Sequence, residues 1–203
     1  MITFLRRIGP IKIIGILLIL AVIVVCSGFY LFTNDYDFDA KYKKSDINTS
    51  LLESTRLENE DKTISILPPK QSNSSLRDGQ IEINLIKQLD EDLAPSIISL
   101  ERSSSRSYNL YSEDGIKSLT SSLESSLKEL DFDILKVYKV EGIGQQAIII
   151  ELSFLNNGIK TRSYNLYAKT DAGLISVIAT SQYSKWDDNK SLLLSSVLST
   201  EIK

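Results

Sequence analysis

The spacing of hydrophobic positions changes several times along the chain, and each spacing predicts a different element. The longest apolar run, from Ile13 to Phe32, holds twenty residues without a charged side chain. A helix of that length rises about 30 Å, which matches the hydrocarbon core of a bilayer. The sequence therefore predicts a transmembrane anchor at residues 13–32, preceded by a short N-terminus at residues 1–12.

Alternating apolar and polar residues predict several β-strands further along the chain. Pro68 and Pro69 stop a short run at residues 63–67, because proline cannot donate a hydrogen bond to a neighbouring strand. Asn157–Gly158 lies between two longer runs and suits a tight hairpin turn. We expect a four-stranded antiparallel meander from residues 134–141, 145–155, 159–169 and 174–181, and strands at or near a sheet edge from residues 81–85 and 97–100.

Two segments show the spacing of an amphipathic helix instead. The first is expected at residues 112–130, with Ser112 as its N-cap, and the second at residues 187–201, capped by Asp187 or Asp188. The first helix carries one apolar stripe, formed by Ile116, Leu119, Leu123, Leu127 and Leu130. The sequence thus predicts an α+β domain, in which two helices flank an antiparallel sheet.

Within the expected strand 145–155, period-two alternation separates two faces. We expect Ile148, Ile150, Leu152 and Phe154 to face the core, and the remaining positions to face away from it. One core face and one outer face are typical of an antiparallel sheet.

Residues 33–60 are expected to link the anchor to the domain at residues 61–203. The stretch 40–62 is rich in Lys, Ser, Asn, Asp and Glu, a composition that cannot bury a core by itself. Three isolated leucines, Leu51, Leu52 and Leu57, could form a short helical turn that docks on the domain. The segment is otherwise interpreted as a polar tether.

Charges near the anchor favour one orientation. Three basic residues precede it and three follow it, but the preceding ones lie closer to the span and are joined by the α-amino group. The positive-inside rule then places residues 1–12 in the cytoplasm and the domain outside. We expect a single-pass protein of the bacterial inner membrane, with its C-terminal domain in the periplasm. The charges compared are Arg6, Arg7 and Lys12 before the anchor and Lys41, Lys43 and Lys44 after it.

Composition excludes several classes of function. The chain has no histidine, so it lacks the usual general base at neutral pH and the commonest metal ligand. Of its 23 basic residues three precede residue 34, so residues 34–203 carry 20 basic and 26 acidic side chains, a net charge of −6. Such a domain repels phosphate, which argues against a nucleic-acid partner.

Three motifs resemble lipidation, calcium-binding or catalytic motifs, but each favours a structural interpretation. Cys26 could be a lipidated cysteine, but Val25 stands where that motif needs a small residue. The acidic residues from Asp35 to Asp46 resemble a calcium loop without its glycine and its terminal glutamate. Ser125 and Lys128 match the S-x-x-K of penicillin-recognising enzymes but lack its companion motifs. No catalytic, cofactor-binding or metal-binding residue is predicted, and we expect no enzyme.

Aromatic residues provide the candidate binding site. The hexapeptide Arg-Ser-Tyr-Asn-Leu-Tyr occurs at residues 106–111 and again at 162–167. Tyrosine and tryptophan are favoured at the centres of protein interfaces, although they also cap sheets and cores. The candidate partner surface comprises Tyr108, Tyr111, Tyr164, Tyr167, Tyr183 and Trp186.

Several short segments carry a resemblance to a known family. They are Ile64-Ser65-Ile66-Leu67-Pro68-Pro69, Asp131-Phe132-Asp133-Ile134-Leu135, Glu141-Gly142 before Gln146-Ala147, Asn157-Gly158, and Trp186-Asp187. In this order they resemble the DcrB-like branch of the PsbP-like α/β/α fold over residues 61–203. Bacterial DcrB proteins are typically tethered through a lipidated cysteine, and Val25 departs from that pattern.

The resemblance implies a binding or assembly scaffold. DcrB-like proteins are envelope proteins linked to phage uptake and envelope upkeep, and they would bind membrane or periplasmic proteins. Related domains include photosystem accessory subunits and chaperones for secreted effectors; those chaperones are cytosolic, so the expected anchor counts against that branch. A carrier or sensor of a small apolar ligand, held between sheet and helix, is the alternative.

Overall fold

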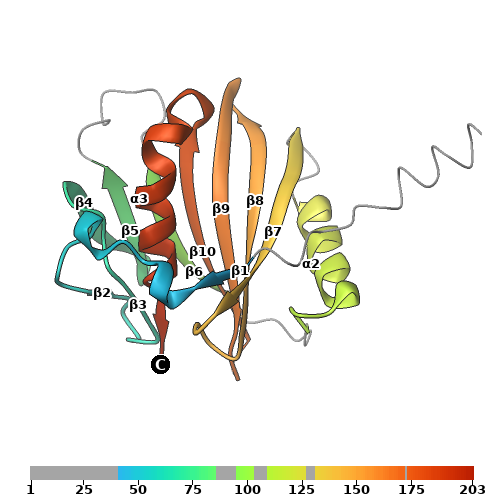
Figure 1. Ribbon diagram of the computed structural model, residues 1–203, viewed down its shortest axis with the longest axis horizontal. Coiled ribbons are helices and arrows are strands. Elements are labelled where there is room, and N and C mark those ends of the chain that lie inside the picture. Colours follow the sequence, from blue (N-terminus) through green and yellow to red (C-terminus); the bar gives the residue numbers. More distant parts are fainter. Residues whose placement is uncertain (1–40, 86–94, 103–108, 127–130, 172) are drawn as a thin grey trace, which may run out of the picture. The chain divides into compact units, whose positions relative to one another are not determined.

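The structure is a computed structural model that describes residues 41–85, 95–102, 109–126, 131–171 and 173–203 (Figure 1). Contacts divide the chain into Met1–Tyr36 and Asp37–Lys203, and the described residues belong to the second unit. The anchor expected at residues 13–32, the N-terminus at 1–12 and Tyr108 lie outside them. Among the described helices none is long and apolar enough to cross a membrane.

Most strands belong to one large sheet. Across the described residues its order is β1-β7-β8-β9-β10-β6-β5-β4, and every neighbouring pair is antiparallel except β1 with β7. Its strands are β1 (Lys41–Lys43), β4 (Ser72–Arg77), β5 (Gln80–Leu85), β6 (Ser96–Arg102), β7 (Phe132–Glu141), β8 (Gln146–Asn156), β9 (Ile159–Lys169) and β10 (Leu174–Gln182). The expected meander is confirmed as β7 to β10.

A small sheet joins distant parts of the chain. Its order is β11-β3-β2, so the end of the chain pairs with the strand before Pro68. Its strands are β2 (Leu57–Glu58), β3 (Ile64–Ile66) and β11 (Glu201–Ile202).

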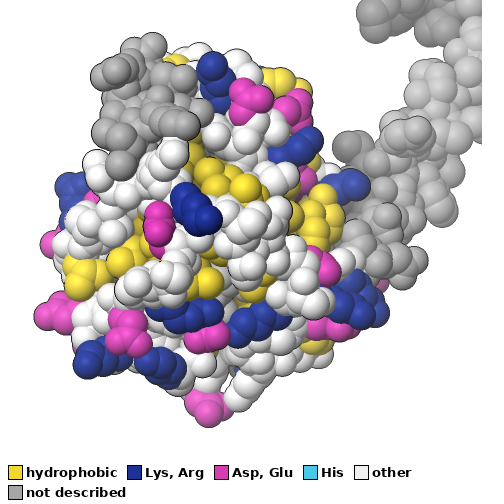
Figure 2. All heavy atoms as spheres, turned by 60° about the vertical axis from the view of Figure 1, so that its left-hand side comes forward, with side chains coloured by type: hydrophobic (Ala, Val, Ile, Leu, Met, Phe, Trp, Pro, Cys, Tyr) yellow, Lys and Arg dark blue, Asp and Glu magenta, His cyan; other side chains and the backbone are white. Residues whose placement is uncertain are grey.

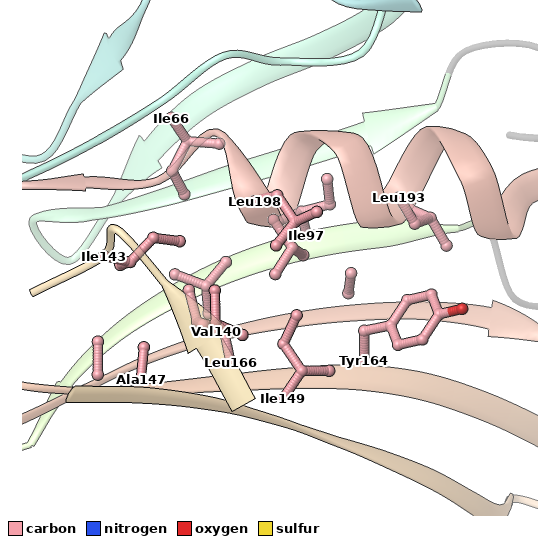
Figure 3. Packing of buried hydrophobic residues seen from close by; sticks show 14 of the residues in the cluster. Ile66, Ile97, Val140, Ile143, Ala147, Ile149, Tyr164, Leu166, Leu193 and Leu198 are labelled. Carbon is pink, nitrogen blue, oxygen red and sulfur yellow. The ribbon is translucent and has the colours of Figure 1, made fainter. Parts of the chain in front are cut away.

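Helix α3 (Trp186–Leu198) covers one face of the large sheet (Figure 1). In Figure 3, Leu193 and Leu198 of α3 lie over Ile97, Leu166 and Ile149 of the sheet, and all five are buried. Each fully buried aliphatic side chain of this kind contributes about 1.5 to 3 kcal/mol relative to exposure.

Helix α2 (Glu113–Ser126) lies beside β7 (Figure 1). Gln146 of β8 accepts a hydrogen bond from the Leu110 amide at 2.9 Å and donates one to Asn109 at 3.1 Å, which ties the entry of α2 to the sheet. The expected N-cap is confirmed, because the Ser112 hydroxyl accepts from the Gly115 amide at 3.1 Å. Residues 127–130 of the expected helix lie outside the described residues.

Both faces of β8 are buried, which corrects the expectation of a single core face. Ala147 and Ile149 belong to the main hydrophobic cluster beneath α3. Ile148 and Ile150 point to the opposite face and are also fully buried. Gln146 shares this opposite face and is bonded to the entry of α2, so the sheet has a helix associated with each face and the simple alternation of exposure is lost.

The segment expected as a polar tether is partly built into the fold. Lys41–Lys43 pairs with β7, 3-10 turns follow at Lys44–Asp46 and Thr49–Leu51, and β2 pairs with β3. Leu52 is buried. Local composition does not predict β1, because its partner β7 lies far away in sequence.

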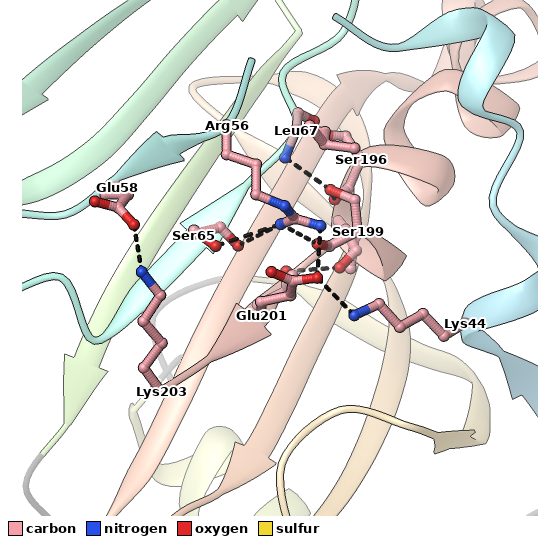
Figure 4. Close-up of polar contacts among 11 residues, drawn as sticks. Lys44, Arg56, Glu58, Ser65, Leu67, Ser196, Ser199, Glu201 and Lys203 are labelled. Carbon is pink, nitrogen blue, oxygen red and sulfur yellow. Dashed lines mark hydrogen bonds and ion pairs between the residues drawn. The ribbon is translucent and has the colours of Figure 1, made fainter. Parts of the chain in front are cut away.

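Arg56 fastens this segment to the end of the chain (Figure 4). Its guanidinium donates to the Ser199 carbonyl at 2.9 Å and to the Ser65 hydroxyl at 3.3 Å, and it forms an ion pair with Glu201 at 2.9 Å. Lys44 binds the same carboxylate at 2.8 Å, and this hydrogen bond lowers the pKa of Glu201. The segment is therefore held by these charge-assisted contacts together with buried or partly buried apolar side chains, namely Tyr42, Ile47, Leu52 and Leu57.

Two further elements differ from the prediction. Strand β4 lies in a stretch rich in serine and asparagine, a composition typical of loops, and no strand was predicted there. The last helix ends at Leu198 rather than at residue 201, since Glu201 and Ile202 pair with β3. It begins at Trp186 without a side-chain cap, so neither Asp187 nor Asp188 has the expected role.

Candidate functional site

Five side chains gather where β9, β10 and α3 meet, and we call them the Arg162 cluster: Arg162, Glu151, Tyr164, Tyr183 and Trp186. The hairpin of β8 and β9 places Tyr164 opposite Glu151 and Arg162 opposite Ser153. Strand β10 then leads through the 3-10 turn Tyr183–Lys185 directly into α3. Local strand register and one tight turn thus bring together residues of β8, β9, the 3-10 turn and α3.

The hairpin turn that aligns these strands is fixed by its sequence. Asn157 and Gly158 have φ angles of 50° and 80°. Both angles are positive, as the tight turn of a two-residue hairpin requires, and Asn-Gly is the pair best suited to it. The predicted turn therefore sets the register that places Arg162 near Glu151.

An ion pair lies inside the cluster. Arg162 donates through Nη2 to Oε1 of Glu151, whose side chain is 6% exposed. The second carboxylate oxygen accepts a hydrogen bond from the Tyr138 hydroxyl at 3.2 Å. Both oxygens of Glu151 are therefore bonded, which offsets much of the cost of burying the charge. Within the described residues, the buried Nε of Arg162 is left without a hydrogen-bond partner.

Aromatic rings enclose the guanidinium. Its central carbon lies 5.1 Å from the centroid of the Trp186 ring and 5.7 Å from that of Tyr183. Tyr164 packs against Trp186 with 4.7 Å between ring centroids. Lys160 places its Nζ 4.6 Å from the centroid of the Tyr183 ring. These are cation–π distances, so the rings stabilise positive charge at this place.

The tyrosines beside the ion pair have raised pKa values. Burial raises the pKa of Tyr138 and of Tyr164, and the nearby negative charge of Glu151 raises both further. Burial also raises the pKa of Tyr42, whose ring lies 4.7 Å from that of Tyr138. Phenols of this kind donate hydrogen bonds at neutral pH and do not act as bases.

The inner part of the Arg162 cluster is buried and its outer part is exposed. Tyr164 and Trp186 are buried, whereas Tyr183 is 47% exposed. Lys160 is exposed and lies opposite Leu155, which is 40% exposed. We call Tyr183, Lys160, Leu155 and the open side of Arg162 the cluster rim. It combines an aromatic ring, an aliphatic side chain and two cations on a rigid support.

The structure brings three of the predicted partner residues together and separates the others. Tyr164, Tyr183 and Trp186 form part of the Arg162 cluster. Tyr167 is buried on the opposite face of β9. Tyr111 lies near the other end of the meander, where its hydroxyl donates to the Val140 carbonyl at 2.8 Å.

Residue patterns did not single out Arg162, Glu151 or Lys160. One signal was present, because Glu151 is an acid inside the apolar run 147–155. A charge in such a run indicates a paired and partly buried group. Its partner could not be read from sequence.

A separate cavity of about 280 Å³ lies at the opposite end of β9. The turn residues Gly144 and Gln145 border it, and Gln145 donates to Asp171 at 2.6 Å. Its lining mixes aliphatic side chains with lysine and threonine: Thr63, Gly144, Gln145, Lys169, Thr170, Asp171, Ile175, Ile202 and Lys203. Across the described part of the chain, no group of three or more acidic or cysteine side chains could hold a metal ion.

No protein-family model and no curated protein matches the chain. Its fold is similar to that of solved structures. The cyanobacterial PsbP of Synechocystis has a TM-score of 0.54 at 14% identity, covering 73% of this chain and 92% of its own. LpqN of Mycobacterium tuberculosis, a protein involved in cell envelope biogenesis, has a TM-score of 0.50 at 13% identity, covering 80% and 98%. The domain thus has a PsbP-like α+β fold.

Proposed function

We propose that this chain is a membrane-anchored interaction module of the bacterial cell envelope, without catalytic activity and of the DcrB-like kind. The uncharged stretch at residues 13–32 would hold it in the inner membrane, with the domain on the periplasmic side. The fold supports this proposal, because a protein of envelope biogenesis shares it.

The cluster rim is the proposed binding surface. The observation that carries the proposal is the position of Tyr183, which is 47% exposed and has both Lys160 and Arg162 within cation–π distance of its ring. Tyrosine, tryptophan and arginine supply most hot spots of protein interfaces, and a rigid ring loses little entropy on binding. The buried Tyr164–Trp186 pair keeps this support fixed in the free protein.

The charges of the rim define the partner. Lys160 and Arg162 approach the Tyr183 ring, and Leu155 adds an exposed aliphatic side chain next to Lys160. A membrane or periplasmic protein that places a carboxylate beside an apolar side chain would match both features. A strongly basic partner would be repelled at this rim.

Site-specific crosslinking in intact cells tests the proposal. A photoreactive phenylalanine analogue replaces Tyr183 in the full chain, and a matched probe replaces Leu135, which is 41% exposed on β7. We expect one protein to be crosslinked at position 183 and not at position 135. Lys160→Glu should abolish that crosslink while the protein level stays unchanged. Equal capture at both positions, or capture that survives the charge reversal, would contradict the proposed surface.

The location requires a separate test. Reporters that are active only in the cytoplasm or only outside it are fused after Lys203 of the full chain. Activity of the external reporter is expected. Activity of the cytoplasmic reporter would overturn the envelope location, whatever the crosslinking result.

A second candidate function rests on the cavity beside Ile175 and Ile202. Its volume of about 280 Å³ is close to the lower limit for small-ligand sites. A carrier of a small amphiphile would use these aliphatic side chains for the tail and Lys169 or Lys203 for an acidic head. Native mass spectrometry of the protein released from membranes should then show added mass, and Ile175→Trp should remove it.

A further inference from the structure

Strand β4 forms one edge of the large sheet. In the described part of the chain, its only strand neighbour is β5. Five of its six side chains, those of residues 73–77, are exposed, so both faces of the strand are open as well as its outer edge. Leu76 is 56% exposed, the largest value among the exposed large hydrophobic residues. An open edge of this length is a template for another strand.

The turn between β4 and β5 determines which main-chain groups are unused. Asp78 and Gly79 have φ angles of 51° and 77°, and Arg77 stands opposite Gln80. In a hairpin with a two-residue turn, the flanking pair exchanges hydrogen bonds and every second pair does so along the strands. The residues whose N–H and C=O groups point away from β5 are therefore Ser72, Ser74 and Leu76.

The two edges of the sheet differ in their protection. At the opposite edge, β1 is three residues long and carries Lys41 and Lys43, both exposed. Short length and lysine side chains are common means of preventing strand addition. Strand β4 has six residues, no proline and no lysine, and its register with β5 shows no bulge. Its single charge, Arg77, stands at the very end.

We propose that β4 pairs with β4 of a second copy of this chain, antiparallel about a two-fold axis at Ser74. Ser74 would stand opposite Ser74 of the second copy, and Ser72 opposite Leu76. Each residue whose N–H and C=O groups point away from β5 would then face another such residue. Each such pair exchanges two N–H···O bonds. Arg77 would lie opposite Gln71, so no like charges meet. The two sheets would become continuous, with a closed, isologous interface.

The side chains of β4 favour this occupant over a foreign segment. A strand that selects a foreign peptide offers pockets for alternate side chains. Here the exposed side chains are small and uncharged over Asn73, Ser74 and Ser75, so nothing on either face selects a sequence. Self-pairing brings no like charges together, and it covers Leu76 with Ser72 of the other copy.

The first experiment compares Ser74→Pro with Ser74→Ala in the full chain, purified in a mild detergent. Proline removes an outward N–H that β5 does not use, and edge strands tolerate it at such positions. Alanine keeps the N–H. Mass determination by light scattering should give a dimer for the native chain and for Ser74→Ala, and a monomer for Ser74→Pro. A monomeric native chain at a concentration of about 100 µM, or a dimeric proline variant, overturns the proposal.

The second experiment does not depend on how well the proline variant folds. In a Cys26→Ser background, a cysteine at position 74 would face its own copy across the axis. Opposite residues in hydrogen-bonded pairs have Cα atoms about 5.5 Å apart, which a disulfide can span. Ser74→Cys should form a crosslinked dimer under mild oxidation at least tenfold faster than Ser75→Cys, which would face position 73. Equal rates at the two positions refute the register.

Discussion

Glu151 of β8 and Arg162 of β9 form an ion pair along the diagonal of their hairpin, with side chains that are 6% and 25% exposed. Tyr138 completes the bonding of the carboxylate. Both charges lie on the α3 face of the sheet, since they alternate in step with Ile149 and Tyr164. A shift of one residue between β8 and β9 would place the two charges on opposite faces of the sheet, so the pair favours a single register.

Loss of either partner should destabilise the fold more than loss of both. Glu151→Leu leaves a guanidinium largely buried without its carboxylate, and we expect a loss of about 3 kcal/mol in the free energy of unfolding. Arg162→Leu leaves the buried carboxylate and should cost about as much. Urea unfolding of the full chain in detergent measures these values. The double variant should be more stable than the sum of the single losses predicts; strict additivity would show that the pair is not coupled.

Alkaline pH should weaken the fold through the buried tyrosines. The folded-state pKa of Tyr138 and Tyr164 lies above the ordinary value of 10.0. Their contribution to stability is therefore complete below pH 10 and is lost as the pH rises through the folded-state pKa, because the unfolded chain releases these protons first. Unfolding at pH 8 and at pH 10.5, with tyrosinate absorbance as the second readout, checks this. Tyr138→Phe should reduce the difference between the two pH values.

Replacing Gly115 of α2 by alanine should destabilise the protein, although the same replacement usually stabilises a helix. Replacing glycine by alanine inside a helix is commonly favourable by up to about 1 kcal/mol. At Gly115 the added Cβ would lie 1.9 Å from the carbonyl oxygen of Asn109. Gly115→Ala should therefore destabilise the protein by roughly 1 to 3 kcal/mol, because the entry of α2 must shift. The control is Ser121→Ala on the exposed side of the same helix, which should be neutral or slightly stabilising.

Arg56→Ala should loosen the segment that precedes β3 from the rest of the domain. Hydrogen exchange of the amides in residues 49–58 should become faster, while β8 and β9 keep their protection, because Arg56 bonds Ser199 and Glu201, which follow the end of α3 and are not part of those strands. Arg77→Ala is the matched control, since Arg77 is 77% exposed and lies 3.9 Å from Glu82. Faster exchange throughout the sheet would mean that Arg56 supports the whole fold.

Local sequence patterns were sufficient to predict the elements that depend on interactions between nearby residues. Asn157 and Gly158 adopt the positive φ angles of a tight turn, and Ser112 caps the helix that follows it. The apolar patterns of β8 and β9 predict strands. Each of these depends on residues within a few positions of one another. For this reason the meander, the two helices and the α+β class could be predicted before the structure.

Elements that depend on distant partners could not be predicted in the same way. Strand β1 lies in a polar segment, and it is a strand because β7, which lies far along the chain, pairs with it. The predicted aromatic site was divided, since Tyr164 and Tyr167 alternate to opposite faces of β9 and only one face meets Trp186.

The sequence by itself determined the uncharged stretch at residues 13–32, the turns, the helix stripe and the class of the domain, because periodicity and local hydrogen bonds decide these features. Tertiary structure alone decided that Arg162 lies against Glu151 and Trp186, that Arg56 reaches Ser199, and that β4 is left at an open edge. The contact of Arg56 joins residues that are distant along the chain, and the other two features depend on strand order and on how α3 packs, which local patterns do not encode.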